Sequence, residues 1–206
     1  KGSAVNPVLR EGNSDRRAPL AVKRYAQTHP HWMGPWDPES KTNVAAMRDD
    51  DFHGNEQTVV MAQDDDLSVR LISHDGEKTQ VLKQSIPVKA GHVVDATFMD
   101  LGSLKSFVRR TIRRAKQENV LFSVHLKATM MKVSDPIIFG HVIRVFFAGV
   151  FKKYGSLIES VGINPNNGLA SIFERLDRLP EEQAVEVRAA FDEAMANGAR
   201  LAMVNS

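Results

Sequence analysis

The sequence predicts an α/β fold in which a mixed sheet with short β-hairpins is followed by a βαβ-like layered region and C-terminal helices. Three observations support this prediction. Short β-like runs alternate with turn residues from 42 to 99. A strand-like run then lies between two helical patterns, at 101–118 and 136–153, which is the alternation typical of α/β proteins. Beyond 164, helix start and stop signals dominate the sequence.

The first regular element is expected at 19–27, where Pro19 precedes apolar residues at helical spacing. Residues 29–38 contain three prolines and a glycine, which excludes regular structure there. Two histidines and two tryptophans in this loop raise the possibility of a metal or stacking site. Packing of the tryptophans over a core edge is favoured, because lone aromatic residues usually serve packing.

Residues 42–99 predict short strands bounded by turns. Asp75-Gly76 between two β-like runs is a strong hairpin signal. Two aspartate triplets, at 49–51 and 64–66, suggest a divalent cation. Consecutive acidic residues in a turn diverge, however, so solvated turns are favoured over a metal site. The expected strands lie at 43–47, 57–62, 67–73, 79–88 and 93–98.

An amphipathic helix is predicted over 101–118, with an apolar stripe and a strongly basic remainder. The basic face raises the possibility of phosphate or nucleic-acid binding, which salt-dependent oligonucleotide binding would reveal. A solvated or salt-bridged face is favoured because no nucleic-acid motif accompanies it. The basic residues are Lys105, Arg109, Arg110, Arg113, Arg114 and Lys116.

A buried strand is predicted over 120–126, followed by a nearly all-apolar helix over 136–153. Lys127 would follow the strand's carboxyl end, where ligands gather in open α/β sheets. The alternative is a lysine whose stem extends to solvent. His141 is expected to be a satisfied core histidine rather than a base. Two further helices are expected over 164–179 and 180–198.

Composition excludes several classes of protein. The 206 residues include 27 basic and 25 acidic residues, for a formal charge of +2, so nucleic acid and anionic membrane are not expected partners. Cysteine is absent, which excludes disulfides, thiolate metal sites and cysteine nucleophiles. The most apolar run falls short of the ~20 residues that span a bilayer. We therefore expect a soluble, cytoplasmic protein.

The first seventeen residues carry the strongest candidate site. Asn6-Pro7 predicts a helix start and Gly12-Asn13 its end. Ser3, Asn6 and Arg10 share one side if this segment is helical, and Arg16-Arg17 follow the break. A hydroxyl, an amide, a helix N-terminus and three guanidinium groups favour a compact polyanion, either a carboxylate or a phosphate. The alternative is a basic surface loop with one helix cap.

This segment resembles a known family. The run Ser3-Ala-Val-Asn-Pro-Val-Leu-Arg-Glu-Gly-Asn-Ser-Asp-Arg-Arg17 resembles the isocitrate-binding segment of the monomeric-type NADP-dependent isocitrate dehydrogenases. The likeness covers essentially the whole chain. It includes Lys127-Ala-Thr-Met-Met-Lys132, which matches the family's catalytic-lysine segment. Further matching segments are 18–25, 29–34, 125–136 and 164–168.

The resemblance implies oxidative decarboxylation of isocitrate to 2-oxoglutarate and CO2, with NADP as hydride acceptor. It assigns substrate binding to Ser3, Asn6, Arg10 and Arg16, and proton handling to Lys127. It also implies Mg2+ or Mn2+, with the cation and NADP bound mainly by residues outside this chain. No cofactor-binding or metal-binding residue is assigned within the chain.

The resemblance further implies an internal segment of a longer monomeric enzyme, one that serves the tricarboxylic acid cycle and the glyoxylate bypass. Residues 1–17 would belong to a neighbouring domain of the parent enzyme, and residues 18–206 to its large central α/β domain. Its partners would be isocitrate and the remainder of the polypeptide. The segment alone would be inactive. The alternative is a non-catalytic anion-binding or assembly module that keeps the family's sequence without its chemistry.

Overall fold

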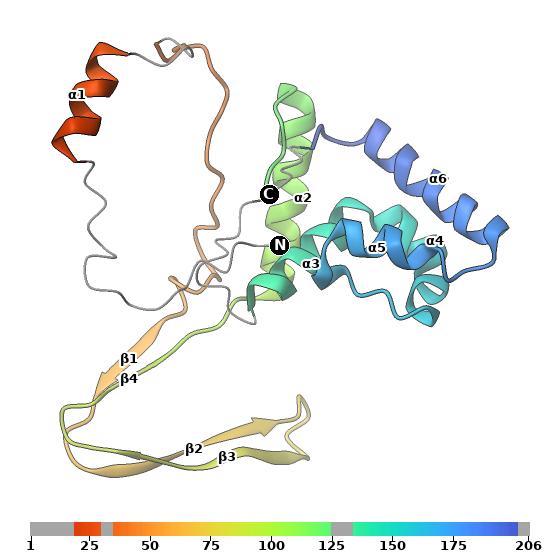
Figure 1. Cartoon of the computed structure of the whole chain (residues 1–206). Helices are drawn as coiled ribbons and strands as arrows, with labels where there is room; N and C mark the ends of the chain where they lie inside the picture. Colours follow the sequence, from red (N-terminus) through yellow and green to blue (C-terminus); the bar gives the residue numbers. More distant parts are fainter. Residues whose placement is uncertain (1–18, 30–34, 125–133, 202–206) are drawn as a thin grey trace. The chain divides into compact units, whose positions relative to one another are not determined.

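The computed structural model describes residues 19–29, 35–124 and 134–201. The chain divides into two compact units. One unit is Ala46–Leu104, which holds all the described strands, and the other is formed by the described residues before and after it. Figure 1 follows the elements in chain order. The predicted boundary after residue 17 lies outside the described residues and stays a prediction.

The strand-containing unit consists of two antiparallel pairs, one nested inside the other along the chain. Strand β1 (Gln57–Val60) pairs with β4 (Val93–Ala96), and β2 (Asp65–Ile72) pairs with β3 (Thr79–Val88). The predicted turn at Asp75-Gly76 is confirmed, because it joins β2 to β3. Gly76 has a φ of 76°, a conformation that glycine adopts without a steric penalty. The run expected at 43–47 forms no strand.

The second unit is helical, and the first four residues of the helix at 101–118 belong to the other unit. The predicted helix at 101–118 is confirmed as α2 (Leu101–Glu118), and those at 19–27 and 180–198 correspond to α1 (Leu20–Thr28) and α6 (Glu181–Asn197). The expected element at 164–179 is a 3-10 turn, η2 (Pro165–Asn167), followed by α5 (Leu169–Leu176). Gly168 separates η2 from α5 at a φ of 89°.

The single helix predicted over 136–153 is wrong. The structure has two helices, α3 (Ser134–Phe146) and α4 (Ala148–Ser160), which are bent by 112° at their break. The break lets both helices direct apolar side chains into one core, which contains Ile143 from α3 and Val150 from α4. Among the described helices none is by itself long and apolar enough to cross a membrane, although α3 and α4 together reach that length and composition.

The helical core is centred on Phe191 of α6, whose side chain is fully buried. Its ring lies 4.9 Å from that of Phe147, 5.5 Å from Phe173 and 6.1 Å from Phe151, measured between centroids. All three contacts are edge-on, the arrangement that the charge distribution of aromatic rings favours. Aliphatic residues of α4, α5 and α6 complete this core, the most buried being Ile158, Ile172, Leu176 and Val187.

The predicted mixture of α and β structure with short hairpins and C-terminal helices is confirmed. The βαβ-like layer has no counterpart in the described part of the chain, where both sheets are antiparallel. Within the expected strand at 120–126, Phe122 makes only an isolated parallel bridge to Leu201. A parallel strand needs a sustained neighbouring strand, and here the neighbouring segment is the short stretch that follows α6.

Candidate functional site

The predicted site residues Ser3, Asn6, Arg10, Arg16 and Lys127 lie outside the residues that the structure describes. Their roles therefore stay predictions. The structure does describe the elements on both sides of residues 125–133, which contain Lys127. It also describes the polar clusters elsewhere in the chain.

The chain that leads into the Lys127 segment is held in place by contacts with the end of α6 and with the residues that follow it. Lys116 donates from Nζ to the carbonyl oxygen of Asn197 at 2.6 Å. The Phe122 N–H donates to the carbonyl oxygen of Arg200 at 2.7 Å. The Arg200 guanidinium in turn donates to Asn119 Oδ1 at 3.3 Å. Three hydrogen bonds thus attach residues 116–122 to residues 197–200, which lie about eighty positions away in the sequence.

On the other side of the Lys127 segment, α3 packs closely against η2. A Cβ atom built on Gly140 would lie 1.9 Å from Asn166 Oδ1 and 3.0 Å from the Asn166 backbone nitrogen. Asn166 is itself held, because its N–H donates to Asn164 Oδ1 at 3.0 Å. The segment 164–168 carries part of the family resemblance. In the structure it packs against the helix that follows the Lys127 segment.

His141 follows Gly140 on α3. The prediction of a satisfied histidine is wrong, because its Nδ1 atom is buried and has no hydrogen-bond partner among the described residues. Burial lowers the pKa of His141, and the nearby charges of Lys105 and Arg144 lower it further. Burial and both charges thus favour the neutral ring, which makes His141 a weaker base.

A groove between α4 and α6, of about 490 Å³, contains a polar cluster that the sequence did not reveal. The Tyr154 hydroxyl donates to Glu186 Oε1 at 2.6 Å, and Lys153 Nζ lies 3.2 Å from the same oxygen. The Tyr154 hydrogen bond, together with Lys153, lowers the pKa of the Glu186 carboxyl. The contacts with Tyr154 and Glu186 raise the pKa of Lys153. A lysine held in its charged form is not suited to act as a general base.

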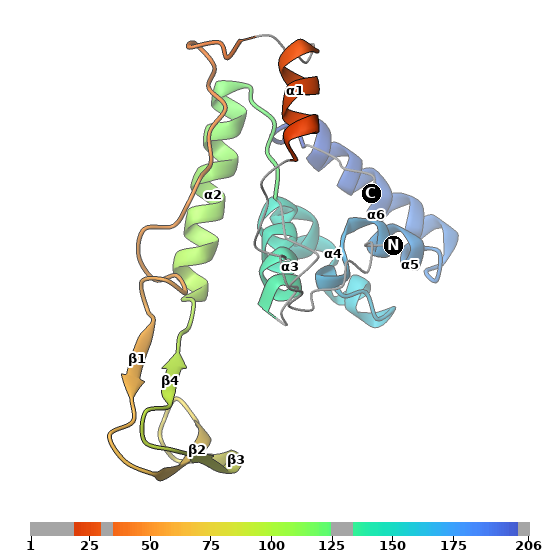
Figure 2. The same ribbon diagram turned by 60° about the vertical axis from the view of Figure 1, so that its left-hand side comes forward.

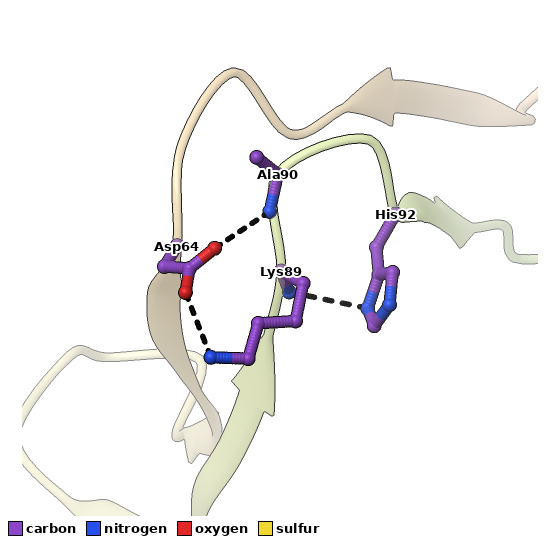
Figure 3. A network of polar contacts seen from close by, with 4 residues as sticks. All are labelled: Asp64, Lys89, Ala90 and His92. Atoms are coloured by element: carbon purple, nitrogen blue, oxygen red, sulfur yellow. Dashed lines mark hydrogen bonds and ion pairs between the residues drawn. The ribbon is translucent and has the colours of Figure 1, made fainter.

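The second aspartate triplet serves the fold (Figure 3). Asp64 accepts hydrogen bonds from Lys89 Nζ at 2.7 Å and from the Ala90 N–H at 2.9 Å, and the Lys89 N–H donates to His92 Nδ1 at 3.2 Å. Asp66 accepts from the Ser85 hydroxyl and the Ile86 N–H across the hairpin. These carboxylates thus bind donors of their own unit.

The first aspartate triplet is used in the same way. Asp51 accepts from the Gly54 N–H at 2.8 Å, and Asp50 accepts from the Ser103 hydroxyl at 2.7 Å. Across the described ranges no three histidine, aspartate or glutamate side chains lie close enough together to hold a metal ion. The side chains that the structure describes therefore do not form a binding site for a divalent cation.

Comparison with known proteins gives a consistent result. The family model for monomeric isocitrate dehydrogenase matches residues 1–206. The chain is 52% identical to an isocitrate dehydrogenase [NADP] of Corynebacterium efficiens, 50% identical to one of Corynebacterium glutamicum and 46% identical to one of Azotobacter vinelandii. Each match covers all of this chain and 28% of the relative, so the chain spans little more than a quarter of their length. The chain belongs to the monomeric isocitrate dehydrogenase family.

Proposed function

We propose that this chain is an internal segment of an NADP-dependent isocitrate dehydrogenase that oxidatively decarboxylates isocitrate to 2-oxoglutarate and CO2. The observation that carries the proposal is the family match over residues 1–206, together with relatives at 44–52% identity that are named isocitrate dehydrogenase [NADP]. A cytoplasmic location is part of the proposal, and the absence of cysteine supports it.

Substrate binding is proposed for Ser3, Asn6, Arg10 and Arg16. Isocitrate has three carboxylates, and an arginine can make two parallel charge-assisted hydrogen bonds to one of them. Arg10 and Arg16 would each bind a carboxylate in this way. Ser3 and Asn6 would supply neutral donors and acceptors that orient the substrate. We also propose that residues 1–17 belong to a domain neighbouring the one that contains residues 18–206.

Lys127 is proposed to handle a proton near the C2 oxygen of isocitrate. A catalytic group has to be held to within a fraction of an ångström, so the segment that carries it needs rigid supports. Two described features are consistent with this requirement. The hydrogen bonds of Phe122 and Lys116 hold the chain before the segment, and the contact of Gly140 with Asn166 holds the helix after it.

NADP and a divalent cation, Mg2+ or Mn2+, are proposed to bind mainly to residues of the longer enzyme outside this chain. NADP would supply the hydride acceptor, and the cation would supply a Lewis acid. The described residues contain no cluster of side chains that could bind the cation, so no step of the reaction is assigned to it here.

The role of Lys127 can be tested by Lys127→Met in the family-length enzyme. We expect turnover to fall by about 10³-fold or more, with little change in the isocitrate dissociation constant. Lys152→Met is a matched control, because Lys152 is an exposed residue of α4 and the chemical change is the same. Steady-state kinetics and calorimetric titration with isocitrate measure the two quantities. Turnover near that of the wild type in Lys127→Met would rule out the proposed role.

A further inference from the structure

We propose that one apolar face of the β2–β3 hairpin is a docking surface for the remaining polypeptide of the family-length enzyme. The surface, called here the ribbon face, consists of Leu67, Val69 and Leu71 of β2 with Ile86 and Val88 of β3. The inference rests on family membership within the proposed function. It goes beyond that function by naming the surface where the missing polypeptide packs.

The strand pairing places these residues on the same face. Leu67 lies opposite Ile86 and Asp65 opposite Val88, and directly paired residues project to the same side of an antiparallel sheet. Two irregularities follow along the ladder. Between the pairs Leu67↔Ile86 and Val69↔Lys83, β2 advances two residues and β3 advances three. Between Val69↔Lys83 and Arg70↔Val81, β2 advances one and β3 two, so both extra residues belong to β3.

Because β2 itself is uninterrupted, its side chains alternate strictly between the two faces. Asp65, Leu67, Val69 and Leu71 lie on the ribbon face, and Asp66, Ser68 and Arg70 lie on the opposite face, where Ile72 ends the strand and Val81 of β3 lies opposite Arg70. Alternation of this kind is typical of a strand that is buried on one side and solvated on the other. The sequence of β2 therefore indicates that the ribbon face is covered in the folded enzyme.

In the described part of the chain, the ribbon face is only partly buried. Val88 is buried, with 8% of its surface exposed, and Leu67 and Ile86 are half-buried. Further along the same face Val69 is 45% exposed and Leu71 is 55% exposed. The neighbouring β1–β4 pair shows the same feature, since Val59, Val60 and Val93 are each more than half exposed. Figures 1 and 2 show that the β2–β3 hairpin is a two-stranded ribbon.

Two-stranded ribbons are marginally stable in water unless a further strand, a helix or another apolar surface packs on them. Exposed valine and leucine side chains at this density favour such packing strongly. The occupant we infer is the rest of the same polypeptide. The chain corresponds to 28% of its relatives, so most of a family-length enzyme is available to supply the cover. The family is described as monomeric, which argues against a second copy.

The charges on this face also indicate what the covering segment contains. Besides Asp65, the ribbon face carries Lys83, which lies opposite Val69 and makes no ion pair with any described residue. An apolar segment with a nearby aspartate or glutamate would complement this surface.

The test compares Leu71→Glu with Ser68→Glu in the family-length enzyme. Both variants add one carboxylate to β2, the first on the ribbon face and the second on the polar face beside Arg70, whose Nε donates to Ser68 Oγ at 3.2 Å. If the ribbon face is covered, Leu71→Glu lowers the thermal unfolding midpoint by about 4 °C or more, and Ser68→Glu changes it little. Equal midpoints for the two variants would argue that the face stays in water.

A second measurement does not depend on how the domains of the enzyme unfold. Hydrogen exchange at the amides of residues 65–88 should be at least about tenfold slower in the wild-type family-length enzyme than in its Leu71→Glu variant. Similar rates in the two proteins would overturn the proposal. A ribbon that becomes protected only as concentration rises, together with a doubled mass in light scattering, would assign the face to a second copy instead. None of these readouts uses isocitrate turnover, so a failure of the proposed reaction would leave this test intact.

Discussion

At the scale of single residues, the hairpin unit depends on carboxylates that accept hydrogen bonds from its own backbone. Asp64 is the clearest case, because one oxygen binds the Lys89 ammonium and the other binds the Ala90 N–H. The Lys89 side chain, followed by the Ala90 N–H, lowers the pKa of the Asp64 carboxyl. Asp75 behaves similarly in the β2–β3 turn, where the Ser73 hydroxyl and the Glu77 N–H lower the pKa of its carboxyl.

These shifts predict the direction of the pH dependence. A carboxyl whose pKa is lower in the folded protein contributes stability above its unfolded pKa of about 3.9, and that contribution is lost as the pH falls through the folded pKa. Lys89→Met should raise the pKa of Asp64 toward its usual value in a carbon-13 carboxyl titration. Lys78→Met, at the far end of the hairpin, serves as the control and should leave it unchanged. If the pKa of Asp64 stayed unaltered in Lys89→Met, the shift would come from the Ala90 N–H alone.

At the scale of elements, the contact between α3 and η2 depends on one glycine. Gly140→Ala would place a methyl group against both the side chain and the backbone nitrogen of Asn166, and the backbone cannot rotate away. We expect this variant to lower the free energy of unfolding by about 1–3 kcal/mol. Gly155→Ala is the matched control in α4, where a Cβ would meet nothing within 4 Å. That substitution should raise the free energy of unfolding by up to about 1 kcal/mol, because alanine favours helices. Denaturant titrations measure the free energy of unfolding of both variants. Equal changes in Gly140→Ala and Gly155→Ala would contradict the steric explanation.

Elements were predictable where their signals are local. The Asp75-Gly76 turn, the strands on either side of it and α2 follow from turn chemistry and from an amphipathic period, each of which acts over a few residues. The division between α3 and α4 was missed because the run is apolar on both sides of Phe147, so periodicity does not show where it bends. The expected strand near Phe122 also failed, because a strand depends on a partner that lies elsewhere in the chain.

At the scale of the whole molecule, the family relation concerns an enzyme much longer than this chain. The resemblance implies that the groups that bind NADP and the divalent cation lie mainly elsewhere in the polypeptide. We therefore expect the 206-residue chain to form no NADPH from isocitrate, NADP and Mg2+, whereas a family-length enzyme does. A spectrophotometric assay of both proteins checks this outcome, and NADPH formation by the short chain would contradict it.

Calorimetric titration of the short chain with isocitrate then distinguishes an anion-binding module from a segment that needs its partner domain.

Several properties of this protein were determined by its sequence alone. Fifteen consecutive residues, Ser3 to Arg17, were enough to indicate the family, because a near-continuous match of that length is far more specific than a short motif. The same residues and Lys127 are the proposed site, and they stay predictions because they lie outside the described residues. Helix starts and hairpin turns were also encoded locally.

Only the tertiary structure decided the contacts between distant parts of the chain. It showed that Gly140 packs against Asn166, that Tyr154 and Lys153 share the carboxylate of Glu186, and that the aspartate triplets bind donors of their own unit. It also showed that Leu71 and Val69 are exposed on the β2–β3 ribbon, although the alternation of apolar and polar residues in β2 predicts a buried face. The physical reason is common to all of them. Each depends on which surfaces meet after the chain has folded, and residue spacing along the sequence does not specify that.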